Sequence, residues 1–395
     1  MNTEVAARPT LFRQALLSAR QGIHLPSFDL SSQDAALAAG EPWRVRLQTL
    51  RGGKQEGVNV VEIDNGRLKL SVIPTRGMSL LRADAGDIRL GWDSPVKEVV
   101  HPQFIRLESR SGLGWLDGFN EAVVRCGLEW AGHPGPDRFR NASGDDVEMN
   151  LSLHGKIGNI PASEVEFSVD AEPPHRLRLR GLVEEKMFHG PQFSLWTEIS
   201  TEPGSLSFRI EDAITNHDAH PQEFQIIYHA NFGPPLLEAG SRFFGAPSSV
   251  TPFNTHAAKG LNEYDRYTAP EPGFVEEVYC LYPGGDAAGR TALLLQNAAA
   301  DRGVEMAFDV ASLPCVTLWK NLASLEEGYV TGLEPGTSFP ANRRHERVAG
   351  RVPRLGPGET RRFGLDFSAL PDAAAVTSVR ERIQALQSAT PYLPR

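Results

Sequence analysis

A histidine and an asparagine stand at the end of an apolar run that stops at a turn. In IIYHANFGPP, residues 226–235, His229 and Asn231 are separated by one residue. Side chains two positions apart in a β-strand point to the same face of the sheet. An imidazole held in this way beside a loop can transfer protons as a general acid or base. The alternative is a buried histidine whose hydrogen bonds are satisfied within the core.

A carboxylate follows a second β-rich run. Glu334 comes directly after YVTGL, residues 329–333, and before the turn sequence PGT. A carboxyl group that is partly removed from water has a raised pKa and suits a general base, although a glutamate that begins a turn is the alternative. Just upstream, LWKNL at 318–322 places Lys320 at the end of a neighbouring predicted strand.

Three further segments carry polar side chains where a hydrophobic core has no use for them. The residues are His154 in SLHGKIGNIPA, Arg76 in IPTRGMSLL, and Asp117 and Glu121 in GWLDGFNEAVV, which also holds Trp115 and Phe119. Sugars stack their C–H faces on aromatic rings and bond their hydroxyls to carboxylates and amides. The guanidinium of Arg76 would donate to sugar hydroxyls or to a carboxylate. Each segment also has an ordinary structural interpretation: a hairpin turn with an exposed arginine is favoured for Arg76 taken alone, a loop that leads into a strand is about as favoured as a site for Asp117 and Glu121, and a surface loop is the alternative for His154.

The elements that must position these residues are β-strands. GVNVVEID, RLKLSVIP, HRLRLRGLVEE, FSLWTEIS and SLSFRIEDAI alternate or run apolar, and turn sequences such as DNG and EPG separate them. Short strands with frequent turns are typical of a sandwich or barrel. No alternation of strands with helices is present, which argues against a parallel α/β sheet. We therefore predict an all-β sandwich as one large domain over residues 46–370.

Helices are predicted at the two ends of the chain. LFRQALLSAR, residues 11–20, places Leu11, Ala15, Leu16 and Ala19 on one helical face, which predicts an N-terminal helical extension over residues 1–45. DAAAVTSVRERIQALQ, residues 372–387, predicts a C-terminal helix packed on the edge of the sandwich, within a C-terminal helix and tail over residues 371–395.

Composition limits the classes of partner. The 395 residues hold 40 Lys and Arg against 49 Asp and Glu, a net charge of -9, and no long basic run, so nucleic acid is not an expected partner. No apolar stretch is long enough for a membrane span or a signal sequence, so we expect a cytoplasmic protein. Its three widely spaced cysteines favour buried free thiols over disulfides or structural zinc. Monomer and homodimer both stay open.

Four of these segments together resemble one family. IPTRGMSL, LHGKIGNIPA, YHANFG and GLEPGTSFPANR, in this order, are similar to motifs of the aldose 1-epimerase (galactose mutarotase-like) superfamily. The similarity covers roughly residues 50–370 and is greatest to a less characterised branch defined as a domain of unknown function. It implies a β-supersandwich with an open sugar-binding cleft and no metal or organic cofactor.

The resemblance also implies roles for individual residues. His229 is similar to the general acid that protonates the ring oxygen, and Glu334 to the base that takes the anomeric hydroxyl proton. His154 and Arg76 are similar to the family's substrate-orienting histidine and binding arginine. The other substrate-binding candidates are Asp117, in place of the family's sugar-binding aspartate, and Glu121, Asn231, Lys320 and Arg343.

One departure from the family leaves the substrate open. The mutarotase proper carries Asn-His ahead of an aromatic pair, whereas here the order is Tyr-His-Ala-Asn-Phe. An Asn-His does occur in TNHD, residues 215–218, but it lies in a strand-to-turn segment, so we rank His217 below His229.

Three functions remain in competition. The first is a cofactor-free isomerase of the aldose 1-epimerase type that acts on a small carbohydrate. The second is a lyase or isomerase of sugars or uronic acids, in which Glu334 removes a C–H proton while Arg76 or Lys320 holds a carboxylate. In that case His154, His229 and Glu334 would also suit a divalent metal. The third is a carbohydrate-binding module without catalysis.

Overall fold

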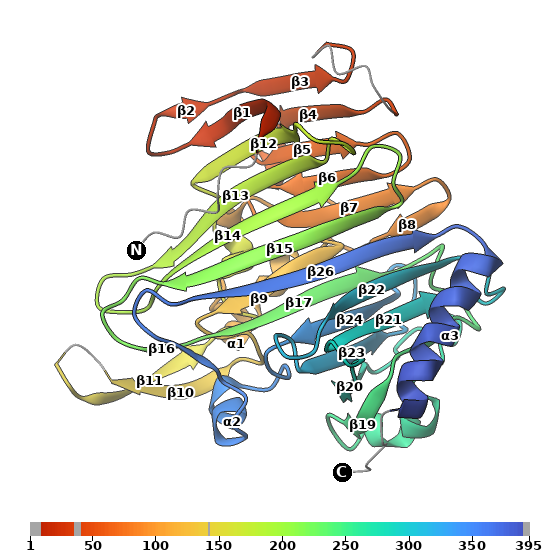
Figure 1. Ribbon diagram of the computed structural model, residues 1–395. Coiled ribbons are helices and arrows are strands. Elements are labelled where there is room, and N and C mark those ends of the chain that lie inside the picture. Colours follow the sequence, from red (N-terminus) through yellow and green to blue (C-terminus); the bar gives the residue numbers. More distant parts are fainter. Residues whose placement is uncertain (1–8, 35–40, 141–142, 390–395) are drawn as a thin grey trace.

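Two large antiparallel sheets form the molecule (Figure 1). The computed structural model describes residues 9–34, 41–140 and 143–389. The ten-stranded sheet has the order β18 (Arg242–Phe244), β21 (Arg290–Gln296), β22 (Gly303–Asp309), β26 (Thr360–Leu370), β15 (Ser207–Asn216), β14 (Gln192–Thr201), β13 (Leu177–Lys186), β12 (Glu164–Asp170), β1 (Thr10–Ser18) and β2 (Ile23–His24). The prediction of an all-β sandwich is confirmed.

The twelve-stranded sheet carries the strands that hold His229 and Glu334. Its order is β19 (Pro247–Pro252), β20 (Glu277–Pro283), β23 (Cys315–Asn321), β24 (Val330–Gly336), β17 (Gln225–Phe232), β9 (Val123–Leu128), β7 (Ser79–Ala85), β6 (Lys69–Ile73), β5 (Asn59–Asp64), β4 (Arg44–Thr49) and β3 (Ser27–Ser31), with β8 (Ile88–Leu90) beside β7. Two small pairs are separate from it: β10 (Gly135–Arg140) with β11 (Asp146–Leu151), and β16 (Gln222–Glu223) with β25 (Arg354–Leu355).

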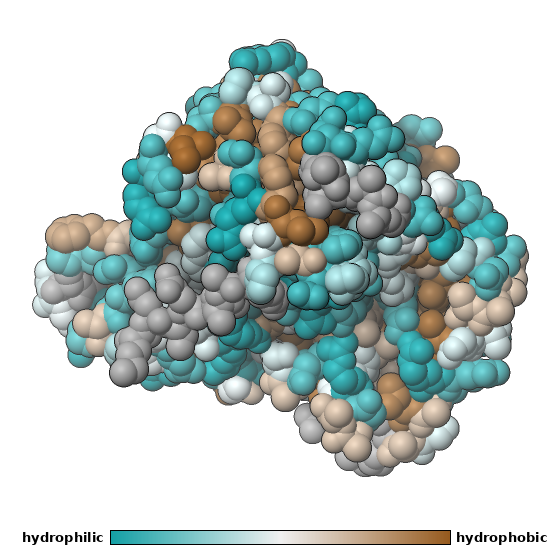
Figure 2. Space-filling model, turned by 45° about the horizontal axis from the view of Figure 1, so that its top comes forward, coloured by the Kyte–Doolittle hydropathy of each residue, from teal (hydrophilic) through white to brown (hydrophobic). Residues whose placement is uncertain are grey.

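Helices are few and short. They are α1 (Ser109–Gly112), α2 (Arg343–Val348) and α3 (Ala373–Ala389), with the 3₁₀ turns η1 (Gly53–Gln55), η2 (Pro102–Phe104), η3 (Gly114–Gly118), η4 (Ile157–Asn159) and η5 (Ala257–Glu263). None of the described helices is long and apolar enough to cross a membrane. In the space-filling view, hydrophilic residues cover most of the visible face and hydrophobic ones form small groups between them (Figure 2).

The core lies between the two sheets, and strand alternation fills it. In β15 every second residue is buried, and Phe208, Ile210 and Ile214 enter the core. Leu70 and Val72 enter the same core from β6 of the other sheet. Burying each such side chain contributes roughly 1.5–3 kcal/mol, so the alternation fixes which face of each strand is turned away from the core.

One buried ion pair joins the sheets through this core. Arg125 of β9 donates from Nη2 to Asp212 Oδ1 of β15 at 2.9 Å, and Tyr228 of β17 donates its hydroxyl to Asp212 Oδ2 at 2.8 Å. All three side chains are buried. Charges this far from water are tolerated when they are paired and hydrogen-bonded, as they are here.

The N-terminal segment is a strand, so the predicted N-terminal helix is wrong. Residues Thr10–Ser18 form β1, which pairs antiparallel with β12 and contains two register irregularities. Leu16 is buried in the core, whereas Leu11 is exposed. The helical spacing was misleading because the free edge of β12 offers hydrogen bonds to the backbone, and tertiary pairing of this kind overrides helix propensity. β3 and β4 likewise join the twelve-stranded sheet.

The C-terminal helix is confirmed. In α3, Val376, Val379 and Ile383 are buried against residues that include Leu294 of β21. The spacing of three and four residues places these side chains on one helical stripe. Asp372 accepts a hydrogen bond from the backbone N–H of Ala375 at 2.8 Å, which caps the start of the helix. The helix lies along the ten-stranded sheet, at the side of β21 and β22 (Figure 1).

The three cysteines form no disulfide, as the sequence predicted. Cys126 and Cys315 are buried and Cys280 is half-buried.

Candidate functional site

His229 and Glu334 meet on the face of the twelve-stranded sheet that is turned away from the core. In β17, Ile226, Tyr228 and Ala230 belong to the core, so alternation turns His229 to the opposite face. β24 pairs antiparallel with β17 and presents Glu334 on that same face. His229 Nε2 lies 3.2 Å from Glu334 Oε1, and the two residues are only 5% and 2% exposed.

Asn231 decides where the proton sits on the imidazole. Its amide Nδ2 donates to the carbonyl oxygens of Glu121 at 3.0 Å and of His229 at 3.1 Å, so its Oδ1 is the acceptor that faces His229 Nδ1 at 2.7 Å. His229 Nδ1 therefore carries a hydrogen. The neutral ring then has its lone pair on Nε2, pointing at Glu334. A single proton must lie in that contact, on either the carboxyl or the imidazole.

Burial pushes both groups toward their neutral forms. Removal from water raises the pKa of Glu334 well above its ordinary value, and the charge of Glu276 adds to this. Removal from water also lowers the pKa of His229 well below its ordinary value, with repulsion from His154 in the same direction. Burial thus favours a protonated Glu334 carboxyl and a neutral His229 imidazole over the charged pair.

Aromatic rings surround the His229 imidazole. The centroids of Phe119, Trp319 and Trp115 lie 5.1, 5.4 and 6.0 Å from that of His229. Trp115 and Phe119 come from η3 and the residue after it, and Trp319 comes from β23, so two separate segments build this wall. Flat apolar rings beside proton-transfer groups suit the C–H face of a sugar.

His154 reaches the same place from a loop. Its ring centroid lies 5.3 Å from that of His229 and 4.7 Å from that of Trp115. Its Nδ1 lies 2.9 Å from the carbonyl oxygen of Ala131, which can only accept, so Nδ1 carries the hydrogen and Nε2 is an acceptor. Burial lowers the pKa of His154 to about 4, which keeps the ring neutral near pH 7.

The backbone at His154 is held in an uncommon conformation. His154 has a φ of 59° and Gly155 a φ of 72°. A Cβ on Gly155 would lie 2.2 Å from the carbonyl oxygen of Trp130, so only glycine fits. Backbone hydrogen bonds from His154 to Gly132 and from Lys156 to Gly127 tie this turn to the end of β9.

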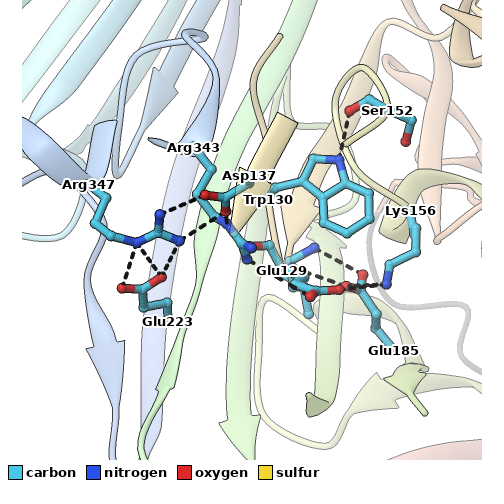
Figure 3. Close-up of polar contacts among 10 residues, drawn as sticks. Glu129, Trp130, Asp137, Ser152, Lys156, Glu185, Glu223, Arg343 and Arg347 are labelled. Carbon is cyan, nitrogen blue, oxygen red and sulfur yellow. Dashed lines mark hydrogen bonds and ion pairs between the residues drawn. The ribbon is translucent and has the colours of Figure 1, made fainter. Parts of the chain in front are cut away.

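A network of ion pairs anchors the turn at His154 and Gly155 to both sheets (Figure 3). Lys156 Nζ donates to Glu129 Oε2 at 2.8 Å and lies 3.7 Å from Glu185 Oε1. Glu185 belongs to β13 of the ten-stranded sheet. Its two carboxylate oxygens accept from the backbone N–H groups of Leu128 and Glu129, each at 3.0 Å. The buried Glu185 carboxylate therefore fixes the end of β9, to which the backbone of His154 is hydrogen-bonded.

Arg343 belongs to the same ion-pair network. Among the described residues, it makes no hydrogen bond or ion pair with His229 or Glu334. Its Nε donates to Asp137 Oδ2 at 2.6 Å, and its Nη1 donates to the carbonyl oxygen of Glu129 at 3.0 Å. Arg347 adds two further bonds to Asp137 (Figure 3). These arginines hold the pKa of Asp137 at about 2, against the effect of burial. They dock α2 onto the hairpin formed by β10 and β11.

Arg76 and Glu121 form a buried pair beside the aromatic wall. Arg76 Nη2 lies 2.7 Å from Glu121 Oε1, and both side chains are fully buried. Arg76 Nη1 also donates to the carbonyl oxygen of Gly118 at 2.6 Å. Burial lowers the pKa of Arg76, while the charge of Glu121 opposes this. The pair thus fixes the segment between η3 and β9 that carries Phe119.

Two of the sequence-based candidates lie elsewhere. Asp117 is exposed on η3, and no recorded contact among the described residues links it to His229 or Glu334. Lys320 follows Trp319 in β23 and so points to the opposite face of the sheet, where its Nζ lies 3.3 Å from Glu277 Oε2. LWKNL lies on the strand that pairs with β24, but alternation lets only one of the two neighbours face Glu334.

Two buried polar groups near the pair are unbonded within the described ranges, and only that of Thr317 was not noted in the sequence. Trp115 Nε1 and Thr317 Oγ1 are buried and have no hydrogen-bond partner within the described ranges. Thr317 lies directly opposite Glu334 in the pairing of β23 with β24. Thr317 sits in an apolar strand sequence, CVTLW, which gave no sign of a site.

The described side chains do not form the metal site that was considered from the sequence. Across residues 9–34, 41–140 and 143–389, no group of three or more His, Cys, Asp or Glu side chains is placed to hold a metal ion. His154, His229 and Glu334, the set considered from the sequence, are therefore not arranged as ligands.

Comparison with known proteins places this fold among related chains. A family model described as a domain of unknown function, DUF4432, matches residues 55–369. No curated protein matches the chain. A Klebsiella pneumoniae structure described as a "putative aldose 1-epimerase" is 41% identical, covers 97% of this chain and 98% of its own, and has a TM-score of 0.91.

More distant structures share the fold alone. A galactose mutarotase-like protein from Clostridium acetobutylicum is 12% identical and has a TM-score of 0.55. Galactose 1-epimerase from Lactobacillus acidophilus NCFM is 12% identical and has a TM-score of 0.54. Each comparison covers 82% of this chain and 98% of the other.

Proposed function

Because the chain belongs to the DUF4432 family and has the galactose mutarotase-like fold, we propose that it is an aldose 1-epimerase-type isomerase that interconverts the two anomers of a sugar. His229 acts as the general acid and Glu334 as the general base. The substrate is a small carbohydrate that places its anomeric carbon next to this pair.

One observation carries the proposal: His229 Nε2 and Glu334 Oε1 lie 3.2 Å apart, a distance at which the two groups can share a proton. When that proton is on His229, the pair consists of an imidazolium and a carboxylate. The carboxylate can take the anomeric hydroxyl proton while the imidazolium gives a proton to the ring oxygen. The C1–O bond of the ring then breaks, and an open-chain aldehyde forms.

The reverse step completes the exchange. Rotation about the C1–C2 bond turns the other face of the aldehyde to the ring hydroxyl. That hydroxyl returns its proton to His229 as its oxygen bonds to C1, and Glu334 gives its proton to the new anomeric oxygen. Every proton is returned, so the pair itself needs no other reactant.

The burial of the pair fits this cycle. Ring opening leaves Glu334 protonated and His229 neutral, the state that burial favours through the raised pKa of Glu334 and the lowered pKa of His229. The ring-opening step therefore removes separated charges from an apolar site. His154 Nε2, a neutral acceptor, is available to orient a substrate hydroxyl, and the Trp319 ring to pack on a C–H face.

Saturation-transfer NMR on a panel of aldoses, sugar acids and keto-sugars tests the proposal. Wild-type protein should accelerate exchange between the anomers of at least one of them. Glu334→Gln and His229→Asn should each lower that rate about 100-fold or more, since a general acid or base contributes roughly 10²–10⁴-fold. His217→Asn is the matched control, because His217 bonds Ser194 on the other sheet, and it should leave the rate unchanged.

Other outcomes would assign the site differently. No acceleration for any sugar, together with new alkene or aldehyde signals, would replace isomerisation with elimination. Line broadening without any reaction would show a binding module. Full activity in Glu334→Gln would remove the assigned base.

A further inference from the structure

Gly332 lies next to the Glu334 carboxyl group, in the middle of β24. The two residues are two positions apart in the strand, so alternation turns both to the same face of the sheet. In the pairing of the strands, Gly332 stands opposite Trp319 of β23 on one side and Asn231 of β17 on the other. Residues of the candidate site therefore surround it.

The Glu334 carboxyl group occupies the space that a side chain at position 332 would fill. A Cβ on Gly332 would lie 2.5 Å from Glu334 Oε1 and 3.3 Å from Glu334 Cδ. It would also lie 3.2 Å from Cε3 of the Trp319 ring. Because heavy atoms that are not bonded prefer separations of roughly 3.5–4.0 Å, only a glycine leaves room for the carboxyl group in this position.

The backbone conformation does not explain this glycine. The φ of Gly332 lies outside the left-handed region that favours glycine, unlike the φ of Gly155. A glycine inside a strand weakens the strand, and it often marks the close approach of another group. At position 332 the approaching group is the carboxyl group of Glu334.

The orientation of this carboxyl group also explains the unpartnered hydroxyl of Thr317. Thr317 stands directly opposite Glu334, and the Cβ atoms of such a pair lie about 4.5–5.5 Å apart. A carboxyl group turned toward β23 could accept a hydrogen bond from this hydroxyl. The carboxyl group instead folds back along β24 over Gly332, and Thr317 Oγ1 has no hydrogen-bond partner within the described ranges.

This orientation brings Glu334 to His229. The atom that lies over Gly332, Oε1, is also the atom that lies 3.2 Å from His229 Nε2. A Cβ at position 332 would have to displace Oε1 by about 1 Å to reach an ordinary contact. A misplacement of about 1 Å can lower a catalysed rate roughly 10²-fold. The contact between the two groups therefore depends on the absence of a side chain at position 332.

We propose that Gly332 is a positioning residue for Glu334. The absence of a side chain leaves room for the carboxyl group and directs its Oε1 toward His229 Nε2. The inference rests on the proposed function, in which Glu334 is the general base. Gly332 acts only through that carboxyl group.

Long-range proton–nitrogen NMR of the histidine rings tests the position of the carboxyl group without any sugar. His229→Asn identifies the signals of His229, and Glu334→Ala gives the Nε2 shift of a ring without its carboxyl partner. Gly332→Ala should move the Nε2 shift of His229 most of the way to that value. Gly356→Ala is the matched control and should leave the shift unchanged, because the nearest atom to a Cβ there, Glu359 Oε2, lies at 3.5 Å.

A double-mutant cycle on the rate of anomer exchange separates positioning from a structural effect. Gly332→Ala should lower kcat about tenfold or more, with little change in KM. Glu334→Asp withdraws the carboxyl group from position 332, so adding Gly332→Ala to it should lower the rate no further. If the glycine has a purely structural role, Gly332→Ala lowers the rate by the same factor in both backgrounds, and the inference is wrong.

The remaining outcomes also decide the question. If Gly332→Ala does not fold, relief of the contact predicts that Gly332→Ala combined with Glu334→Asp does fold, and failure of both overturns the inference. If the wild type exchanges no sugar but the His229 shift moves as expected, the position of the carboxyl group is confirmed and only the proposed function fails. If the wild type exchanges a sugar and Gly332→Ala changes neither rate nor shift, the function stands and this inference fails.

Discussion

The buried neutral state of His154 predicts how stability depends on pH. In the folded protein, burial lowers the pKa of His154 from 6.5 to about 4. Between these values the unfolded chain binds a proton at this position and the folded chain does not. The free energy of unfolding therefore falls as the pH falls through this window, and the contribution is fully present only above the unfolded pKa.

The size of this effect follows from the two pKa values. On going from about pH 7.5 to about pH 5.0, linkage gives a loss of about 2 kcal/mol in the free energy of unfolding from this group alone. His154→Asn removes it. Asparagine tolerates the positive φ of 59° at this position, and its side-chain N–H can still donate to the carbonyl of Ala131. The variant should therefore fold and lack this part of the pH dependence.

Urea unfolding at both pH values measures the difference. The wild type should lose about 2 kcal/mol more than His154→Asn between the two conditions. His24→Asn, at an exposed histidine of β2, controls for removal of an imidazole as such and should behave like the wild type. Equal losses in the wild type and His154→Asn would refute the idea that this ring is buried and neutral.

Three further predictions follow from the same structure. The rate of anomer exchange should show a broad plateau around neutral pH, because burial disfavours both gain and loss of a proton by the pair, and Glu334→Gln should remove the acidic limb of the pH–rate profile, since the base that must be deprotonated is then absent. Gly155→Ala should lower the free energy of unfolding by about 3 kcal/mol or more, measured by denaturation, since its Cβ would meet the Trp130 carbonyl at a positive φ. Arg125→Met should destabilise by about 3–5 kcal/mol, and adding Asp212→Asn should recover much of this. A double variant no more stable than Arg125→Met would show that the ion pair is not what Arg125 contributes.

Local features could be predicted from the sequence. Which face of a sheet a side chain occupies, and which distant segment it contacts, could not. His229 and Glu334 were selected because each ends an apolar run beside a turn, a pattern visible within ten residues, and the structure places them 3.2 Å apart. Which of Trp319 and Lys320 faces the site depends on where the core lies, and this is set by the opposite sheet. Lys320, a basic residue at a strand end, was therefore grouped with His229 although it lines a cavity on the other face of the sheet.

Long-range pairing explains the other differences. The segment 11–20 has helical spacing, yet it becomes β1 because β12, more than 140 residues later, offers it an edge. Arg343 was grouped with the sugar-binding residues, but it is occupied by Asp137 of a hairpin 206 positions earlier. Neither partner can be read from the local sequence. Fold class and the C-terminal helix needed no such information, because periodicity alone defines them.

The carboxylate of Glu185 links the ten-stranded sheet to the candidate site around His229 and His154. It comes from β13, yet it holds the two N–H groups at the end of β9 against which the His154 turn is built. A substitution on the ten-stranded sheet can thus alter the orientation of His154 without touching any residue near it. Residues that govern turnover should be sought in both layers, and a screen restricted to the neighbours of His229 would miss some of them.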